Sequence, residues 1–135
     1  MISAPMTRAD SFQGRWLQVS LSDAVPPYLR SLIRQVEPYP AAVRDARGQI
    51  LACNRSYDAL FGLASVPPSS RNAFLIHPWN VPQRFLHPVV GSLWLAPYQL
   101  WTDPHPDGLA AIGFTPVDVA TAARLPHLSR LRPGE

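Results

Sequence analysis

The chain has very little of what marks the common kinds of site. Its only cysteine is Cys53, which excludes an intrachain disulfide and a metal site built from four cysteines. It has no lysine, and its twelve basic side chains are arginines spread singly along the sequence. Surfaces that bind nucleic acid more often gather their basic residues into a stripe or run. We therefore expect dispersed, solvated arginines and no direct binding of DNA by this chain.

Long apolar runs and catalytic motifs are absent as well. No apolar stretch approaches the ~20 residues that a membrane-spanning helix needs, and residues 1–9 lack the apolar centre of a signal peptide. We therefore expect a cytoplasmic protein with no membrane partner. No Gly-x-Ser-x-Gly motif and no glycine-rich phosphate loop occurs, so the sequence gives no support for catalysis or for a cofactor.

The four histidines show no spacing typical of metal ligands. We expect His87 to fix the entry into a strand through its ring and the proline that follows it. The alternative is a small enzyme in which His77 or His87 acts as the acid–base group of an apolar cleft. Neither histidine stands in a recognisable catalytic pattern, so the sequence favours a protein that is not an enzyme and holds no metal.

What the chain does have is enough apolar sequence for one folded domain. Its 135 residues are 47% hydrophobic, which is ordinary for a globular protein. Its sixteen prolines are about twice the usual share of ~5%, and they stand between patterned segments. We expect one domain over residues 22–128, an N-terminal tail or arm over residues 1–21, and a C-terminal tail over residues 129–135.

Helix signals occur at three places. A first helix is predicted after Pro26-Pro27, because an apolar stripe at helical spacing follows this pair. Asn54 is placed to cap the start of a second helix, and Gly62 to cap its end. Pro116 at a first helical position, with Asp118 in the first turn, predicts a closing helix that runs to about Arg124.

The remaining pattern predicts an antiparallel sheet. Gly48 supplies the positive φ that a short hairpin turn needs, and residues 103–108 form a second strong turn signal. Prolines predict an irregular course, with single helical turns, over residues 79–87. Strands alternating with helices in this order indicate an α+β (α/β) fold with PAS-like topology, a five-stranded antiparallel sheet with helices mainly on one face. The five expected strands are Ala41–Asp45, Gln49–Cys53, Val89–Leu95, Tyr98–Thr102 and Leu109–Phe114.

Residues 40–54, followed by Leu60-Phe61-Gly62, resemble the opening of a PAS domain. They more closely resemble the ligand-binding domain of MmyB-like transcription regulators, whose members typically show a Pro-Ala pair, a hairpin ending in Leu-Ala-x-Asn, a helix and a later Arg-Asn pair. Here that pair is Arg71-Asn72. Residues 87–95 resemble a second block of this family, so the resemblance extends from Pro27 to about Leu128.

Three departures from the family pattern shape the expectations. Family members usually begin with a helix-turn-helix domain, and too few residues precede Pro27 to hold one, which also argues against DNA binding. The several helices that normally follow the Arg-Asn pair are reduced to residues 73–86. We therefore expect a smaller pocket and an apolar surface that pairs with a second copy, as a homodimer, or with a regulatory protein. Cys53 stands where the family prefers Trp and is expected to be a buried apolar residue.

The resemblance implies a fatty-acid-like ligand held between the sheet and the helices. An arginine at the mouth of such a cleft would meet the carboxylate, while apolar walls cover the chain of the ligand. Collapse of these walls would instead leave a ligand-free interaction fragment. We expect a non-enzymatic PAS-like sensor that binds an apolar small molecule or a protein partner. The expected ligand-binding residues are Leu60, Phe61, Phe74, Ile76, Leu93 and Trp94, with Arg71 or Asn72 at the mouth.

Overall fold

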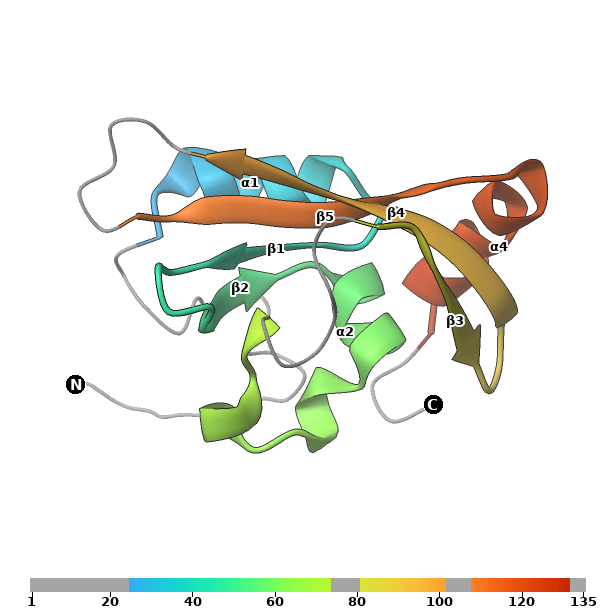
Figure 1. The fold of residues 1–135 in the computed structure, drawn as a ribbon, viewed down its shortest axis with the longest axis horizontal. Helices are drawn as coiled ribbons and strands as arrows, with labels where there is room; N and C mark the ends of the chain where they lie inside the picture. Colours follow the sequence, from blue (N-terminus) through green and yellow to red (C-terminus); the bar gives the residue numbers. More distant parts are fainter. Residues whose placement is uncertain (1–24, 74–80, 102–107, 132–135) are drawn as a thin grey trace.

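A computed structural model describes residues 25–73, 81–101 and 108–131 of the chain (Figure 1). These residues form an α+β domain with a five-stranded sheet. The elements in chain order are α1 (Pro27–Gln35), β1 (Ala41–Arg44), β2 (Ile50–Cys53), α2 (Arg55–Phe61), the short 3₁₀ helices η2 (Leu63–Ser65) and η3 (Pro68–Ser70), β3 (Gln83–His87), β4 (Gly91–Trp101), β5 (Ala110–Pro116) and α4 (Val119–Ser129). Within the described residues no helix is long and apolar enough to cross a membrane.

The sheet has the order β2-β1-β5-β4-β3, and all of its neighbours pair antiparallel. The first strand therefore lies beside the last, with Ala41 opposite Gly113 and Arg44 opposite Ala110. This confirms the predicted PAS-like five-stranded antiparallel fold. Pairing of β1 with β5 joins the first and the last strand inside the sheet.

Local signals in the first half of the chain act as predicted. Gly48 adopts φ 89° in the turn between β1 and β2, and the Asp45 carboxylate accepts backbone N–H groups of Arg47 and Gln49 in the same turn. The Asn54 side chain caps α2 by accepting the Tyr57 N–H. The left-handed Gly62, with φ 61°, ends this helix. Each of these features depends on a single residue type, which is why they are visible in sequence.

The predicted irregular course of residues 79–87 is wrong for Gln83–His87, which form strand β3 at the edge of the sheet. The prolines that suggested irregularity, Pro82 and Pro88, lie just outside this strand. Prolines are tolerated beside an edge strand because they interrupt no ladder hydrogen bond there. They limit the length of β3 without preventing it.

The two strands predicted at Val89–Leu95 and Tyr98–Thr102 are one strand, β4, which runs from Gly91 to Trp101. Thr102 lies outside the described residues. Pro97 does not break β4, because pairing with β3 ends at Leu95 and only the β5 side continues beyond it. A proline without an N–H group is acceptable where one side of a strand has no ladder.

The closing helix is also shifted from its prediction. Pro116 ends β5, opposite Leu95, and is not the first residue of a helix. The helix begins at Val119, because the Asp118 carboxylate accepts the Thr121 N–H as an N-cap. It continues past the predicted end and through Pro126 to Ser129. Its buried side chains Leu125 and Leu128 hold this last turn against the core, which offsets the hydrogen bond lost at the proline.

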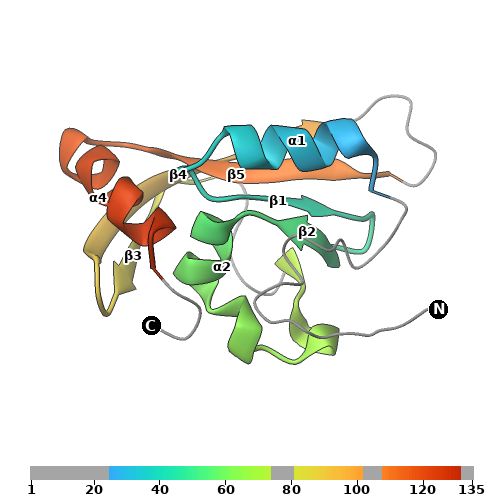
Figure 2. The same ribbon diagram turned by 180° about the vertical axis from the view of Figure 1, so that it is seen from behind.

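The helices were predicted to lie mainly on one face of the sheet, which holds for α2 and α4, whereas α1 lies on the other face. Helix α1 covers one face over β1, β2 and β5, and Figure 2 shows it in front of β5. Helices α2 and α4 pack on the opposite face. Successive strand residues point to opposite faces, so Ala42 faces α2 and α4 while Val43 faces α1. The core below α1 contains Val25, Leu29, Ile33, Val43, Leu109 and Ala111; the core below α2 and α4 contains Ile50, Tyr57, Leu93, Leu95, Ile112, Phe114, Leu125 and Leu128.

Candidate functional site

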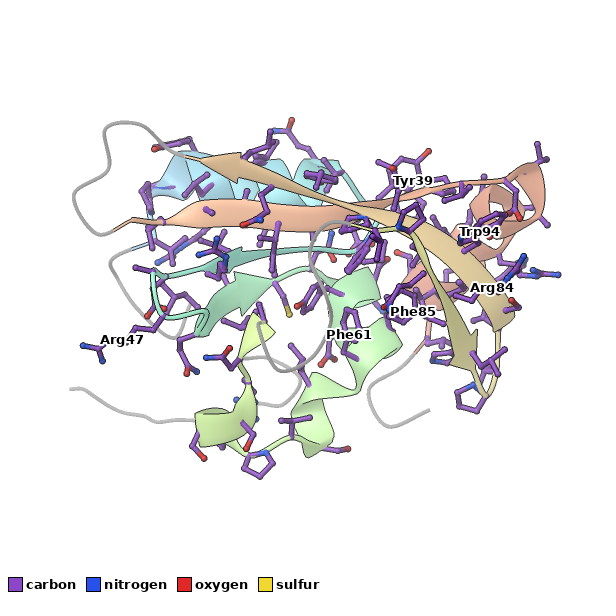
Figure 3. All side chains as sticks on the ribbon, in the orientation of Figure 1. Tyr39, Arg47, Phe61, Arg84, Phe85 and Trp94 are labelled. Atoms are coloured by element: carbon purple, nitrogen blue, oxygen red, sulfur yellow. The ribbon has the colours of Figure 1, made fainter. Side chains whose placement is uncertain are left out.

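An aromatic cluster joins α2 to the sheet. The Phe61 ring lies 5.6 Å from the Phe85 ring and 5.8 Å from the Phe114 ring, measured between centroids, and 4.7 Å from the Tyr57 ring. Figure 3 shows Phe61 and Phe85 side by side, one from α2 and the other from β3. Tyr57 and Phe114 are fully buried, whereas Phe61 and Phe85 are only partly buried. The cluster thus runs from the core to its solvent-facing margin.

The structure brings three of the predicted ligand residues together. Leu60 and Phe61 pack against the same core cluster that contains the fully buried Leu93. Phe74 and Ile76 lie outside the described residues. Phe85 was missed because its segment was predicted to be irregular. The five-residue spacing between the flanking prolines, which suits a short strand, is the signal that points to it.

Trp94 does not line the same wall as Leu93. The two residues are neighbours on β4, so their side chains point to opposite faces of the sheet. On its own face Trp94 lies opposite Arg84 of β3, whose guanidinium carbon is 4.5 Å from the centroid of the indole ring (Figure 3). This cation–π contact stabilises the outer half of the sheet.

Arg71 and Asn72 hold loops in place. The Arg71 Nε donates hydrogen bonds to the carbonyls of Leu63 and Val66, at 3.2 and 2.9 Å, and so binds both ends of η2. Burial lowers the pKa of Arg71, and the negative charge of Asp58 acts in the opposite direction. The Asn72 Nδ2 donates to the Arg47 carbonyl in the hairpin turn. Their role at the mouth of a ligand cleft stays a prediction.

His87 fixes the start of the turn that leads from β3 to β4. Its Nδ1 accepts the N–H groups of Val89 and Val90, at 3.0 and 3.2 Å, and its Nε2 lies 3.1 Å from the Ala59 carbonyl of α2. Because Nδ1 accepts, Nε2 carries the proton and donates. Both nitrogens are therefore engaged with the main chain, which confirms the predicted role and disfavours His87 as an acid–base group. His77 lies outside the described residues.

A hollow of about 370 Å³ opens between the β3–β4 turn and the C-terminal half of α4. The turn contributes two valines, and the C-terminal part of α4 with its C-cap contributes two arginines and a histidine. One of these, Arg124, donates from a terminal guanidinium nitrogen to the Ser92 carbonyl at 2.7 Å. The hollow is lined by Val89, Val90, Arg124, His127, Arg130 and Leu131. No single segment forms it, and the sequence patterns did not predict it.

Comparison with known protein families finds a match, and it covers the first part of the domain. Residues 25–80 match the MmyB-like transcription regulator ligand binding domain. The resemblance expected from the sequence is thereby confirmed over α1, the β1–β2 hairpin, α2 and the pair Arg71-Asn72. No curated protein matches the chain.

The match to the MmyB-like family ends before β3, so the resemblance of residues 87–95 to a second family block lies beyond it. The matched family is described as a ligand-binding domain of transcription regulators. Among the described residues, no group of three or more His, Cys, Asp or Glu side chains is arranged to hold a metal ion. Cys53 is buried in the core, as predicted, and burial raises the pKa of its thiol well above the ordinary value.

Proposed function

We propose that this chain is a non-enzymatic, PAS-like sensor domain of the cytoplasm whose ligand is an apolar, fatty-acid-like molecule. The observation that carries the proposal is the partly buried pair Phe61–Phe85, at the margin of a core whose first half matches a ligand-binding family. Large apolar side chains that remain partly exposed gain about 25 cal/mol for each Å² that a ligand covers.

The proposed site bridges two elements that are distant in sequence. Leu60 and Phe61 come from α2, and Phe85 comes from β3, while the His87 contact to the Ala59 carbonyl ties these elements together. A ligand between them would contact both at once and stabilise their present arrangement. Each CH₂ group buried there contributes about 0.8 kcal/mol. The sequence prediction also assigns Arg71, Asn72, Phe74, Ile76 and Leu93 to this ligand. Trp94 is left out of the proposed site because it points to the other face of the sheet.

Medium-chain fatty acids such as decanoate, titrated against tryptophan fluorescence and by calorimetry, test the site. Phe61→Ala and Phe85→Ala should each weaken binding about tenfold or more, because each removes a large part of one apolar wall. Leu86→Ala is the matched control, since Leu86 is the next residue on β3, is 84% exposed, and points to the other face. Thermal melts establish that each variant is folded. Absence of binding to the wild type, or equal affinity in all variants, overturns the proposal.

A homodimer is the second part of the proposal. Leu86 and Leu100 lie on the α1 side of the sheet, over the strands that α1 leaves uncovered, and both are more than half exposed. Exposed apolar surface of this kind favours association with a second copy. Sedimentation equilibrium of the purified chain tests it: a monomer at high micromolar concentration excludes the dimer and leaves the ligand site untouched.

A further inference from the structure

The hollow beside α4 combines an apolar floor with a positively charged rim. Val90 and Leu131 pack against the core cluster below α2 and α4, so they form apolar walls. Arg124 and His127 come from α4, Arg130 is its C-cap residue, and all three lie around the same space. Its described lining contains no acidic side chain. A space with these walls is complementary to a molecule that is apolar at one end and anionic at the other.

One of the cationic groups is already held in position. The Arg124 guanidinium donates to the Ser92 carbonyl of β4 at 2.7 Å, which ties it to the sheet. A guanidinium has five N–H donors, so this bond leaves it able to donate to an anion as well. A donor that is fixed before the ligand arrives loses little conformational entropy on binding.

Two carboxylates on elements near α4, Glu37 and Asp118, are engaged with groups of their own. Glu37 accepts hydrogen bonds from the hydroxyls of Ser56 and Ser129, the latter at 2.8 Å. Asp118 caps the far end of α4 by accepting the Thr121 N–H at 2.8 Å. Both acids therefore have partners of their own, although the charge of Asp118 also acts on Arg124.

The size of the hollow restricts the ligand further. Its volume of about 370 Å³ is at the lower end of the range of ~300–1,000 Å³ that is typical of ligand pockets. A ring or a short branched chain fits within this space. We propose that this hollow is a second binding site, separate from the Phe61–Phe85 margin, and that it takes a compact organic anion with one carboxylate on a small aromatic or branched aliphatic group.

The test uses the full chain labelled with ¹⁵N and titrated with sodium benzoate, with neutral benzamide as the isosteric control. Benzoate should shift the backbone amide signals of Val89, Val90 and Leu131, and benzamide should bind at least tenfold more weakly. Arg130→Gln should weaken benzoate binding about tenfold, since a hydrogen bond to a charged group is lost. Arg34→Gln, an equal change of charge on the exposed last turn of α1, should leave the affinity unchanged. Val89→Trp fills the hollow from an exposed position and should abolish binding.

Several results overturn this proposal. Equal affinity for benzoate and benzamide would mean that the charge of the ligand does not contribute to binding. Equal effects of Arg130→Gln and Arg34→Gln would mean that the arginine beside the hollow does not contact the ligand. If benzoate shifts no backbone amide signals, or only those of Phe61 and Phe85, benzoate does not bind in the hollow. Decanoate binding tests the proposed sensor function alone. If Phe61→Ala weakens it and Arg130→Gln does not, the two sites are distinct.

Discussion

The Asn54 side chain is the point at which three elements of this domain are fastened together. Its Oδ1 accepts the N–H groups of Ala41 in β1 and Tyr57 in α2, at 3.1 and 3.0 Å. Its Nδ2 donates to the carbonyls of Ile33 in α1, at 2.8 Å, and of Tyr39 in the loop before β1, at 2.9 Å. Asn54 is itself buried. One side-chain amide therefore satisfies four main-chain groups, which is its full hydrogen-bonding capacity of two donors and two acceptor sites.

Asn54→Ala should be among the most destabilising single substitutions in the chain. It removes an N-cap, worth about 1 kcal/mol, and leaves further main-chain groups without partners in a buried place, at about 1–3 kcal/mol each. Allowing for relaxation and entry of water, we expect a loss of about 3–5 kcal/mol from a total that is typically ~5–15 kcal/mol. Urea denaturation followed by fluorescence and circular dichroism measures it. Asn72→Ala, which removes an exposed bond to the Arg47 carbonyl, is the control and should cost less than about 1 kcal/mol.

Asn54→Asp distinguishes the network from a simple cap. Aspartate keeps the oxygen that accepts from Ala41 and Tyr57, but its second oxygen faces the carbonyls of Ile33 and Tyr39. Ionisation is disfavoured there, so the pKa of this aspartate in the folded state is raised above ~3.9. Its stability should therefore approach that of the wild type as the pH falls towards 4 and separate from it as the pH rises. A loss below 1 kcal/mol for Asn54→Ala, or no dependence of the Asn54→Asp difference on pH, refutes the reasoning.

Three further predictions concern packing, acid stability and thiol reactivity. Gly113→Ala places a Cβ 2.5 Å from the Tyr98 hydroxyl oxygen; it should lower stability by about 1–3 kcal/mol in a urea melt, and Tyr98→Ala should recover part of that loss in a double-mutant cycle. Hydrogen bonds from Thr121 lower the pKa of Asp118 below 3.8. The ionised carboxylate therefore stabilises the fold above pH 3.8, and this contribution is lost as the pH falls through the lowered pKa. Asp118→Ala should reduce the loss of stability at acid pH, measured by urea melts at several pH values. Cys53, whose buried thiol has a pKa raised well above 9.0, should resist iodoacetamide at pH 8 in the folded protein and react at once in denaturant, as mass spectrometry would record.

The parts of the fold that sequence analysis predicted correctly are those decided within a few residues. Gly48 permits a tight hairpin turn, Asn54 accepts an N–H one turn into α2, and Gly62 takes up the left-handed conformation after it. Each of these depends on one residue type in one local conformation. The four hydrogen bonds of Asn54 show the limit of such reasoning, because only the cap is local. Its bonds to Ile33 and Tyr39 depend on where α1 packs.

The errors in the second half have a common cause in the prolines. A proline stops a strand only where its missing N–H would have bonded to a neighbour, and that depends on which strands lie beside it. Pro97 lies where β4 has already parted from β3, so β4 continues through it. Pro82 and Pro88 bound β3 from outside. Sequence alone gives the positions of these prolines but not which strands lie beside them. Strand boundaries predicted from the prolines alone are therefore wrong in this half of the chain.

The candidate sites also differ in whether local sequence or tertiary packing determines them. Alternation along a strand already implies that Leu93 and Trp94 face opposite ways, so their assignment to one cleft could have been avoided from sequence. The hollow beside α4 is different, because its walls meet only through tertiary contacts. The Trp94 N–H bonds to the Thr121 hydroxyl, and the Arg124 guanidinium bonds to the Ser92 carbonyl. These two bonds set the position of α4 on β4 and thereby bring the cationic turns of the helix over the β3–β4 turn. No pattern within either segment carries that information, since the register between them exists only in the folded chain.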